Sequence, residues 1–211
     1  MSANERQGPV PGGLHIDALF PTFVFGREHP APQGLNETLL AFSYAVRASD
    51  EEGGIVSARG GWQSKHDMQK YPEFQPLVRF IDTTMIEVRS FLSIRESVRF
   101  YVCDMWININ GRGGYNVPHI HGNSYFSGVY YVKTHEGCGE IAFHEPMKLR
   151  EYFNVPYAEV TPRNCFQTRY RAVPGRMYVF PSYLPHEVTA NEADEDRVSV
   201  SFNILAEFGA A

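Results

Sequence analysis

Two histidines separated by one residue lie near the start of the segment NVPHIHGNSYFSGVYYV, residues 116–132. Side chains two positions apart in an extended chain point to the same side, so the imidazoles of His119 and His121 can converge on one point. Neutral imidazole is a ligand for zinc, copper, iron and nickel. A His-x-His pair alone is weak evidence of a metal site, because it also occurs at surfaces and in cores. The strand that follows should alternate between two faces, one with Ser127, Val129 and Tyr131 and the other with Gly128, Tyr130 and Val132.

A third candidate ligand lies far downstream. Residues 178–188 combine an apolar strand, a turn bracketed by two prolines, and His186, which opens the next strand. A histidine arriving on another strand could complete a metal site with the first two.

The strand beginning at Arg197 has two chemically different faces. Its alternation predicts an apolar face that packs into a core and a polar face that lines a pocket. The apolar face carries Val198, Val200, Phe202 and Ile204, and the polar face carries Arg197, Ser199, Ser201 and Asn203.

These motifs resemble the Fe(II)/2-oxoglutarate-dependent oxygenases, and most closely one uncharacterised bacterial and phage group among them. The resemblance is close in the C-terminal half of the chain and loose in the N-terminal half. The motifs that carry it are Gly60-Gly61-Trp62-Gln63-Ser64, Trp106-x-Asn108, Gly113-Gly114-Tyr115-Asn116, His119-x-His121, Ser127-Gly128-Val129-Tyr130-Tyr131-Val132, Phe180-Pro181-Ser182 with His186, and Arg197-x-Ser199.

The resemblance implies an enzyme that couples oxidative decarboxylation of 2-oxoglutarate to oxidation of an unknown substrate, with Fe(II) as the metal. His119 and His186 match the two histidine positions of the family. The residue two after the first histidine is usually Asp or Glu, whereas this chain has His121. Three neutral imidazoles would leave the iron centre one positive charge higher, which favours a dianionic co-substrate. Either His121 is the third ligand, or it points away and another group takes that position.

The resemblance also implies which residues bind 2-oxoglutarate. Arg197 is the candidate clamp, because its planar guanidinium matches a carboxylate. Ser199, Tyr131 and Asn108 are the further candidates. Arg197, Tyr131 and Asn108 each have a structural alternative: a surface arginine, a core tyrosine, and an asparagine that ties a loop.

The expected fold is mainly β (α+β): a double-stranded β-helix of the jelly-roll or cupin-like kind with supporting N-terminal helices. The helices are expected at residues 35–48 and 76–94. Strands are expected at 99–109, 139–144, 175–180, 187–190 and 197–206, with a short edge strand within 15–25. In the strand at 99–109, one face should carry Tyr101, Cys103, Met105, Ile107 and Ile109, and the other Trp106 and Asn108.

The 211 residues suit a flexible N-terminus, residues 1–13, followed by a single domain, residues 14–211. An irregular excursion over 145–172 is the candidate substrate-facing lid. Its aromatic residues are Tyr152, Phe153, Tyr157, Phe166 and Tyr170.

Composition limits the partners. The net charge of −5 argues against a nucleic-acid partner. The three widely spaced cysteines and the lack of an apolar leader or membrane-length run indicate a cytoplasmic protein that does not enter a membrane. The substrate, a small molecule or a protein, stays open, as does assembly into a homo-oligomer.

Two other functions compete with an oxygenase. One is a cupin-like metal-binding barrel without oxygenase activity, either an isomerase or a binding module. The other is a non-enzymatic protein that keeps the fold. The Arg197-x-Ser199 pair favours the oxygenase, because an isomerase does not need a clamp for a dicarboxylate.

Overall fold

The computed structural model describes residues 13–14, 16, 19–54, 57–148, 152 and 155–209. The expected flexible N-terminus therefore lies outside the described residues, apart from Gly13. The two helices are α1, Pro32–Ser49, and α2, Gln75–Phe91. The strands are β1 (Phe25–Glu28), β2 (Ala58–Gln63), β3 (Val98–His119), β4 (Phe126–Lys133), β5 (Glu140–His144), β6 (Gln167–Arg171), β7 (Arg176–Pro181), β8 (His186–Val188) and β9 (Arg197–Phe208).

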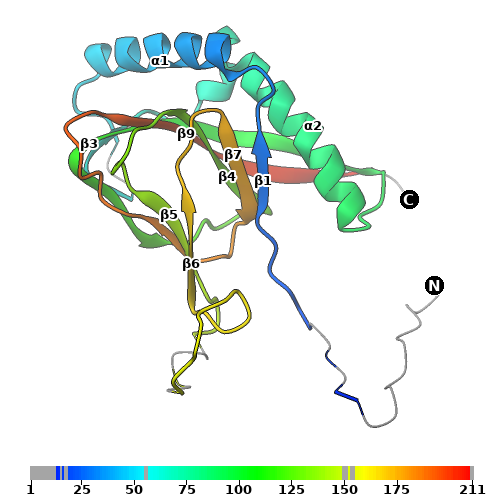
Figure 1. The fold of residues 1–211 in the computed structure, drawn as a ribbon. Helices are drawn as coiled ribbons and strands as arrows, with labels where there is room; N and C mark the ends of the chain where they lie inside the picture. Colours follow the sequence, from blue (N-terminus) through cyan, green and yellow to red (C-terminus); the bar gives the residue numbers. More distant parts are fainter. Residues whose placement is uncertain are drawn as a thin grey trace.

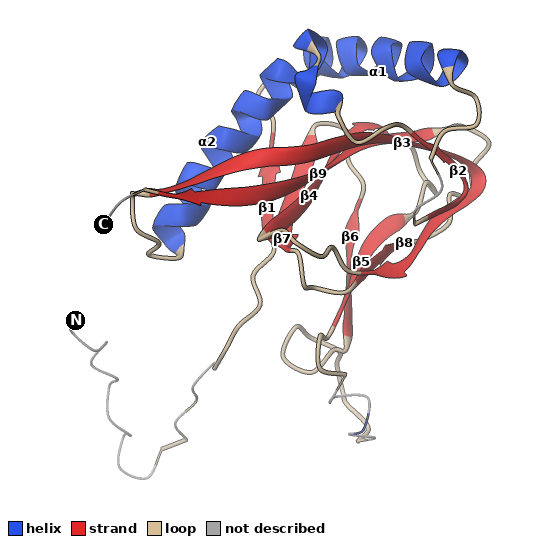
Figure 2. Cartoon of the chain, turned by 180° about the vertical axis from the view of Figure 1, so that it is seen from behind, coloured by secondary structure: helices blue, strands red, loops and turns tan. Residues whose placement is uncertain are grey.

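The strands form one nine-stranded sheet in the order β1-β7-β4-β9-β3-β8-β5-β6, with β2 paired to β3. The 22-residue strand β3 connects two parts of this sheet. Its first half pairs with β9, and its last residues pair with β8. Figure 2 shows β3 and β9 running together, with β5, β6 and β8 folded beneath them. The sheet thus curves into a half-barrel, which confirms the expected double-stranded β-helix.

Both helices cover the outer face of the half-barrel (Figure 1). Proline in the first turn suits each helix, because its missing N–H has no partner there in any case. Leu77, Ile81, Met85 and Val88 of α2 recur at helical spacing and are buried. They pack with the apolar face of β9 in the larger of two cores. The two expected helices are confirmed, with ends that differ by a few residues.

The inner face of the sheet encloses a smaller core. Val129 and Tyr131 of β4 point into it, whereas Tyr130 and Val132 point into the core under the helices. The alternation predicted for this strand is therefore confirmed. Gly128 is required on the helix side, because a Cβ there would lie 2.3 Å from the Phe202 ring.

The faces predicted for the strand at 99–109 are wrong in its first half. The pairing of β3 with β9 shifts between Val102 and Asp104, which leaves Cys103 as an extra residue. Such a bulge reverses the alternation. As a result, Phe100 and Val102 pack with Met105 in the core under the helices, and Tyr101 and Cys103 do not share that face.

Two further predictions need correction. The edge strand expected within 15–25 is found at β1, which pairs only with β7 and shares only Phe25 with the expected range. Pro21 cannot donate to a strand ladder, which disfavours pairing before that point. The excursion expected over 145–172 contains strand β6, paired with β5. Tyr170 of β6 packs on Phe143 and Tyr178 within the inner core.

Candidate active site

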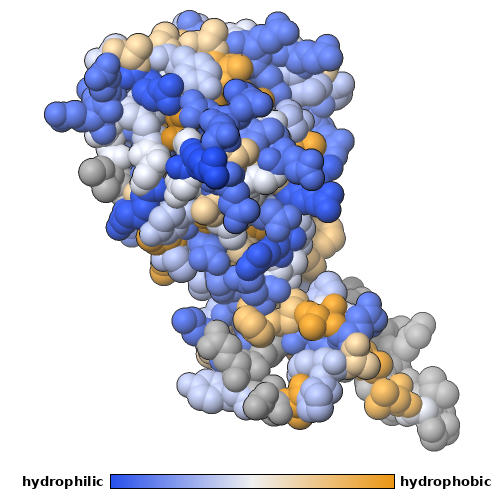
Figure 3. All heavy atoms as spheres, turned by 60° about the vertical axis from the view of Figure 1, so that its left-hand side comes forward, coloured by the Kyte–Doolittle hydropathy of each residue, from blue (hydrophilic) through white to orange (hydrophobic). Residues whose placement is uncertain are grey.

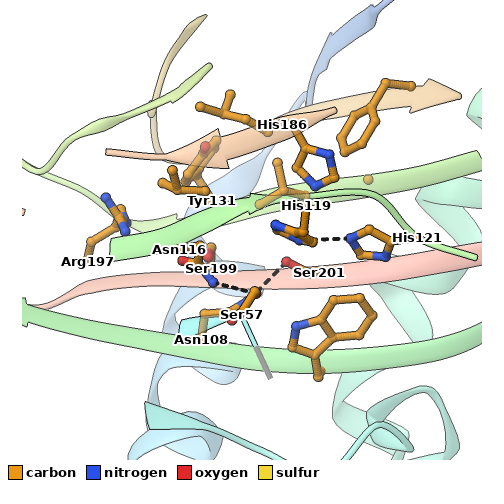
Figure 4. A pocket seen from close by; sticks show the side chains of 16 residues that line it. Ser57, Asn108, Asn116, His119, His121, Tyr131, His186, Arg197, Ser199 and Ser201 are labelled. Atoms are coloured by element: carbon orange, nitrogen blue, oxygen red, sulfur yellow. Dashed lines mark hydrogen bonds between the residues drawn. The ribbon is translucent and has the colours of Figure 1, made fainter. Parts of the chain in front are cut away.

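Three histidines converge at the mouth of the half-barrel. His119 ends β3, His121 follows it, and His186 opens β8 directly opposite His119 in the pairing of the two strands. The Nε2 atoms of His119 and His121 are 3.2 Å apart. One ring nitrogen from each of the three histidines lies within 4.8 Å of the others. Figure 4 shows the three rings facing one another.

The second ring nitrogen of each histidine has an oxygen partner. Nδ1 of His119 lies 2.7 Å from the Val117 carbonyl, and Nδ1 of His186 lies 2.9 Å from the Leu184 carbonyl. Nδ1 of His121 lies 2.7 Å from Oδ1 of Asn203. A carbonyl oxygen can only accept, so an Nδ1–H donates in each pair and the Nε2 lone pair is left for a ligand. Such outer partners are typical of histidines that bind metals.

The three imidazoles are neutral near pH 7. Burial is the main cause of the lowered pKa of His119. Burial, followed by the neighbouring His119, lowers the pKa of His121 to about 4 and that of His186 to about 3. A group of neutral, closely spaced nitrogen donors suits a transition-metal cation.

No carboxylate joins this cluster in the described part of the chain, where these histidines form the only group of three or more candidate ligands. Asp104 lies on β3 opposite Asn203 of β9. Its negative charge raises the pKa of His121, but only as a minor cause.

A polar wall continues from the histidines into the half-barrel. Ser199 of β9 is paired with Asn108 of β3 on one side and with Tyr131 of β4 on the other. These three predicted residues therefore form one row across the sheet, and Arg197 lies two residues along β9. All four line the same cavity as the three histidines (Figure 4).

Arg197 and Tyr131 carry polar atoms without partners. Arg197 is only 1% exposed, and its Nη1 donates to the carbonyls of Cys138 and Thr189. Its Nη2 and the hydroxyl of Tyr131 are buried and have no hydrogen-bond partner among the described residues. Burial also raises the pKa of Tyr131, so its hydroxyl stays protonated and can donate. Buried donors of this kind are costly unless an acceptor satisfies them, and a carboxylate is such an acceptor.

Asn108 is already bonded within the protein. Its Oδ1 accepts a 2.7 Å hydrogen bond from Gln63, and its Nδ2 donates a 3.0 Å hydrogen bond to Ser201. It therefore ties β2 to β9, two strands rather than the loop that its structural alternative named. Its role in co-substrate binding stays a prediction.

Trp106 also lines the cavity, on the face of β3 that it was predicted to share with Asn108. Its ring stacks on His121 at 5.6 Å between centroids and on the exposed His66 at 4.4 Å. The signal was its position two residues before Asn108, which places both side chains on one face of β3. Asn203 was assigned to the polar face of β9, but its contact with His121 could not be read from the sequence.

The loop between β5 and β6 protrudes below the half-barrel (Figure 1). Its exposed aromatic residues include Tyr152, Tyr157 and Phe166, while Phe153 lies outside the described residues. Figure 3 shows a mostly hydrophilic body, with apolar side chains scattered among polar ones on the part below it. A role of this loop as a lid stays a prediction.

Comparison with known proteins gives a family match for the part of the chain that contains the histidine cluster. Residues 104–203 match the family described as "Putative 2OG-Fe(II) oxygenase". No curated protein matches the chain.

Solved structures share the fold. A prolyl-4-hydroxylase from Pseudomonas putida has a TM-score of 0.61 at 16% identity, over 86% of this chain and 92% of that one. The epimerase SnoN, in complex with Fe3+, alpha ketoglutarate and nogalamycin RO, has a TM-score of 0.64 at 10% identity, over 90% and 82%. A prolyl hydroxylase from Trichoplax adhaerens, with a hypoxia inducible factor peptide, has a TM-score of 0.58 at 13% identity, over 86% and 83%.

The matched segment begins just after the bulge in β3 and ends in β9, so it contains the three histidines, Tyr131 and Arg197. Neither helix of the described chain, nor any shorter helical turn in it, has the length and apolar character needed to cross a membrane. Residues 104–203 thus match the 2OG-Fe(II) oxygenase family, and the solved structures above show the same fold over most of the chain.

Proposed function

We propose that His119, His121 and His186 bind Fe(II) through their Nε2 atoms, so that an imidazole takes the place of the family's carboxylate. The observation that carries this proposal is the convergence of one ring nitrogen from each of the three histidines. In each ring, the Nδ1 atom faces an oxygen acceptor, which leaves Nε2 for the metal. Three imidazoles on one side of a metal leave the remaining positions open for the co-substrate and oxygen.

We further propose that Arg197, Tyr131 and Ser199 bind the distal carboxylate of 2-oxoglutarate. The unpartnered Nη2 of Arg197 and hydroxyl of Tyr131 support this assignment, because both are buried donors in the cavity that contains the histidines. Asn108, in the same row as Ser199, is a further candidate through the second N–H of its amide.

Charge supports the same arrangement. Three neutral ligands leave the full charge of a divalent ion uncompensated, and Arg197 adds a cation at the other end of the cavity. A dicarboxylate such as 2-oxoglutarate matches a cation at each end. The bound metal supplies oxygen activation, while these side chains orient the co-substrate, and the inner core beside them excludes water.

The substrate that we propose is a small molecule or a peptide side chain. The solved structures with this fold include a prolyl hydroxylase with a peptide and an epimerase with nogalamycin RO. The loop between β5 and β6 is the candidate substrate lid. The three free cysteines support a reducing, cytoplasmic location, and residues 14–211 are proposed to act as one domain.

Turnover without added substrate tests the assignment. Purified protein supplied with Fe(II), ascorbate and 2-oxoglutarate should release succinate and consume oxygen slowly. At a 2-oxoglutarate concentration near the parent's dissociation constant, Arg197→Ala should strongly reduce this turnover and keep metal binding. A protein that binds metal but neither binds nor decarboxylates 2-oxoglutarate would instead support the cupin-like metal-binding barrel.

A further inference from the structure

His121 differs from the other two histidines in how its ring is held. The Nδ1 atoms of His119 and His186 face backbone carbonyls two residues earlier in the chain. The Nδ1 of His121 faces a side chain on another strand, Asn203 of β9, at 2.7 Å. His121 therefore depends on a residue that is distant in sequence.

Asn203 lies at the end of a chain of hydroxyl groups. Ser124 lies 2.9 Å from Ser182, Ser182 lies 2.9 Å from Ser127, and Ser127 lies 2.8 Å from Oδ1 of Asn203. Ser127, Ser182 and Asn203 are all buried. The carbonyl of Ser182 also accepts the backbone N–H of His121 at 3.0 Å, which joins the chain to the loop that carries the histidine.

The direction of these hydrogen bonds follows from the chemistry of each group. Oδ1 of Asn203 has no hydrogen, so the hydroxyl of Ser127 must donate to it. A hydroxyl donates only once, so Ser127 accepts from Ser182, and Ser182 in turn accepts from Ser124. The three hydroxyls therefore point toward Asn203, and each polarises the next. The oxygen of the Asn203 amide is thereby turned toward His121.

We propose that Asn203, oriented by the Ser127 and Ser182 hydroxyls, is the positioning residue that makes His121 a metal ligand. Its oxygen accepts the Nδ1–H of His121 and so leaves the lone pair on Nε2, beside the Nε2 of His119. This inference rests on the proposed ligand set. The reversed amide would donate to Nδ1 and place the proton on Nε2, where it blocks a metal.

Trp106 supports the same role from the ring face. Its indole stacks on His121 at an angle of 23° and restricts rotation of the imidazole. Asn203 therefore fixes the tautomer of His121, and Trp106 fixes the plane of its ring. His121 is the histidine in the position where the resembled family has a carboxylate.

Anaerobic Co(II) titrations of three variants test the proposal. Asn203→Leu removes the acceptor and should weaken Co(II) binding by about 10- to 100-fold, the range for loss of a ligand's outer partner. Asn203→Asp keeps an acceptor and should bind Co(II) about as tightly as the parent. If the leucine variant does not fold, Asn203→Ala replaces it in the titration. Thermal unfolding shows whether each variant is folded.

Nitrogen-15 NMR of the metal-free protein reports which ring nitrogen of His121 carries the proton. If Asn203 only stabilised the fold, its substitution would not change this tautomer. His121, assigned by loss of its signal in His121→Ala, should carry its proton on Nδ1 in the parent and shift it toward Nε2 in Asn203→Leu. Parent-like Co(II) affinity in Asn203→Leu, or equal weakening in the leucine and aspartate variants, would overturn the proposal. Parent-like affinity in His121→Ala would instead overturn the proposed ligand set.

Discussion

At the scale of single residues, the unusual feature is an imidazole where the family places a carboxylate. The exchange removes a negative charge from the metal centre, and Asp104, whose charge acts on His121, lies outside the histidine cluster. The consequences of the exchange can be measured one side chain at a time.

Substitution of His121 tests whether this residue is the third metal ligand or whether another group takes that position. If it is a ligand, His121→Ala should weaken metal binding by more than the roughly 10- to 100-fold cost of losing an outer partner. His121→Asp restores the family's usual ligand set and should still bind the metal. An anaerobic Fe(II) titration compares both variants with the parent protein. Equal Fe(II) affinity in all three proteins would exclude His121 as a ligand.

Arg197 offers a test of the co-substrate end. Arg197→Ala should weaken 2-oxoglutarate binding by about 1.5–3 kcal/mol, the range for a hydrogen bond to a charged group. Tyr131→Phe removes one neutral donor and should cost about 0.5–1.5 kcal/mol. Calorimetry with the metal-loaded proteins measures both.

The matched control for this test is Arg169→Ala, because Arg169 is exposed on β6 and lies outside the cavity. Its 2-oxoglutarate affinity should equal that of the parent. Unchanged affinity in Arg197→Ala would move the clamp elsewhere.

The depressed histidine pKa values predict how stability depends on pH. Folding holds the pKa of His121 at about 4 and that of His186 at about 3, whereas both lie near 6.5 in an unfolded chain. Between these values the unfolded chain binds more protons, so the free energy of unfolding of the metal-free protein should fall as the pH drops below about 6.5. Each histidine can add a slope of up to about 1.4 kcal/mol per pH unit.

Urea unfolding between about pH 7 and 5 measures this slope, a range chosen above the titration of ordinary carboxylates. His186→Asn should give a flatter profile, because one linked proton is lost. Parallel profiles for the parent and His186→Asn would contradict the prediction.

At the scale of elements, the packing of β4 against β9 positions the site. Gly128→Ala would place a Cβ 2.3 Å from Phe202 and 2.8 Å from the Tyr178 carbonyl. Such overpacking should cost about 1–3 kcal/mol of stability. Gly34→Ala in α1 is the matched control, since nothing lies within 4 Å of its new Cβ. It should instead stabilise the helix by about 0.5–1 kcal/mol. Thermal unfolding of both variants checks the prediction, and an unchanged Gly128→Ala would show that the two strands can move apart.

The sequence predicted most of these elements, because alternation in strands and helical spacing are local signals. Both helices, the two faces of β4 and the two faces of β9 follow from such spacing. The bulge at Cys103 was missed, because it arises from the pairing of β3 with β9 and leaves no mark in the local pattern. Strand β6 was missed for a related reason: its five residues are recognisable only beside β5.

The site was predictable to the extent that its residues share a strand face or a family motif. The spacing of His119 and His121 was enough to predict that their rings converge. The contact between His121 and Asn203 joins residues 82 positions apart, so only the folded sheet reveals it. The same holds for the bonds that engage Asn108 with Gln63 and Ser201.

At the scale of the whole molecule, the cavity joins strands from both parts of the half-barrel. His186 comes from β8, whereas Arg197, Ser199 and Tyr131 come from the β9 and β4 layer. A metal and a co-substrate bound between them would therefore hold the two parts together. Ligands that bind only the folded state raise its stability by mass action.

Thermal unfolding should report this coupling. At a free 2-oxoglutarate concentration about 100 times its dissociation constant, the metal-loaded protein should gain about 2.7 kcal/mol. For a chain of this size, that corresponds to a rise of about 5–11 °C in the melting temperature. Arg197→Ala should keep the stabilisation by metal and lose most of that by 2-oxoglutarate at the same concentration. His186→Ala should lose both, because the metal end of the site is then incomplete. A 2-oxoglutarate effect of the same size in metal-free protein would place the co-substrate outside the proposed site.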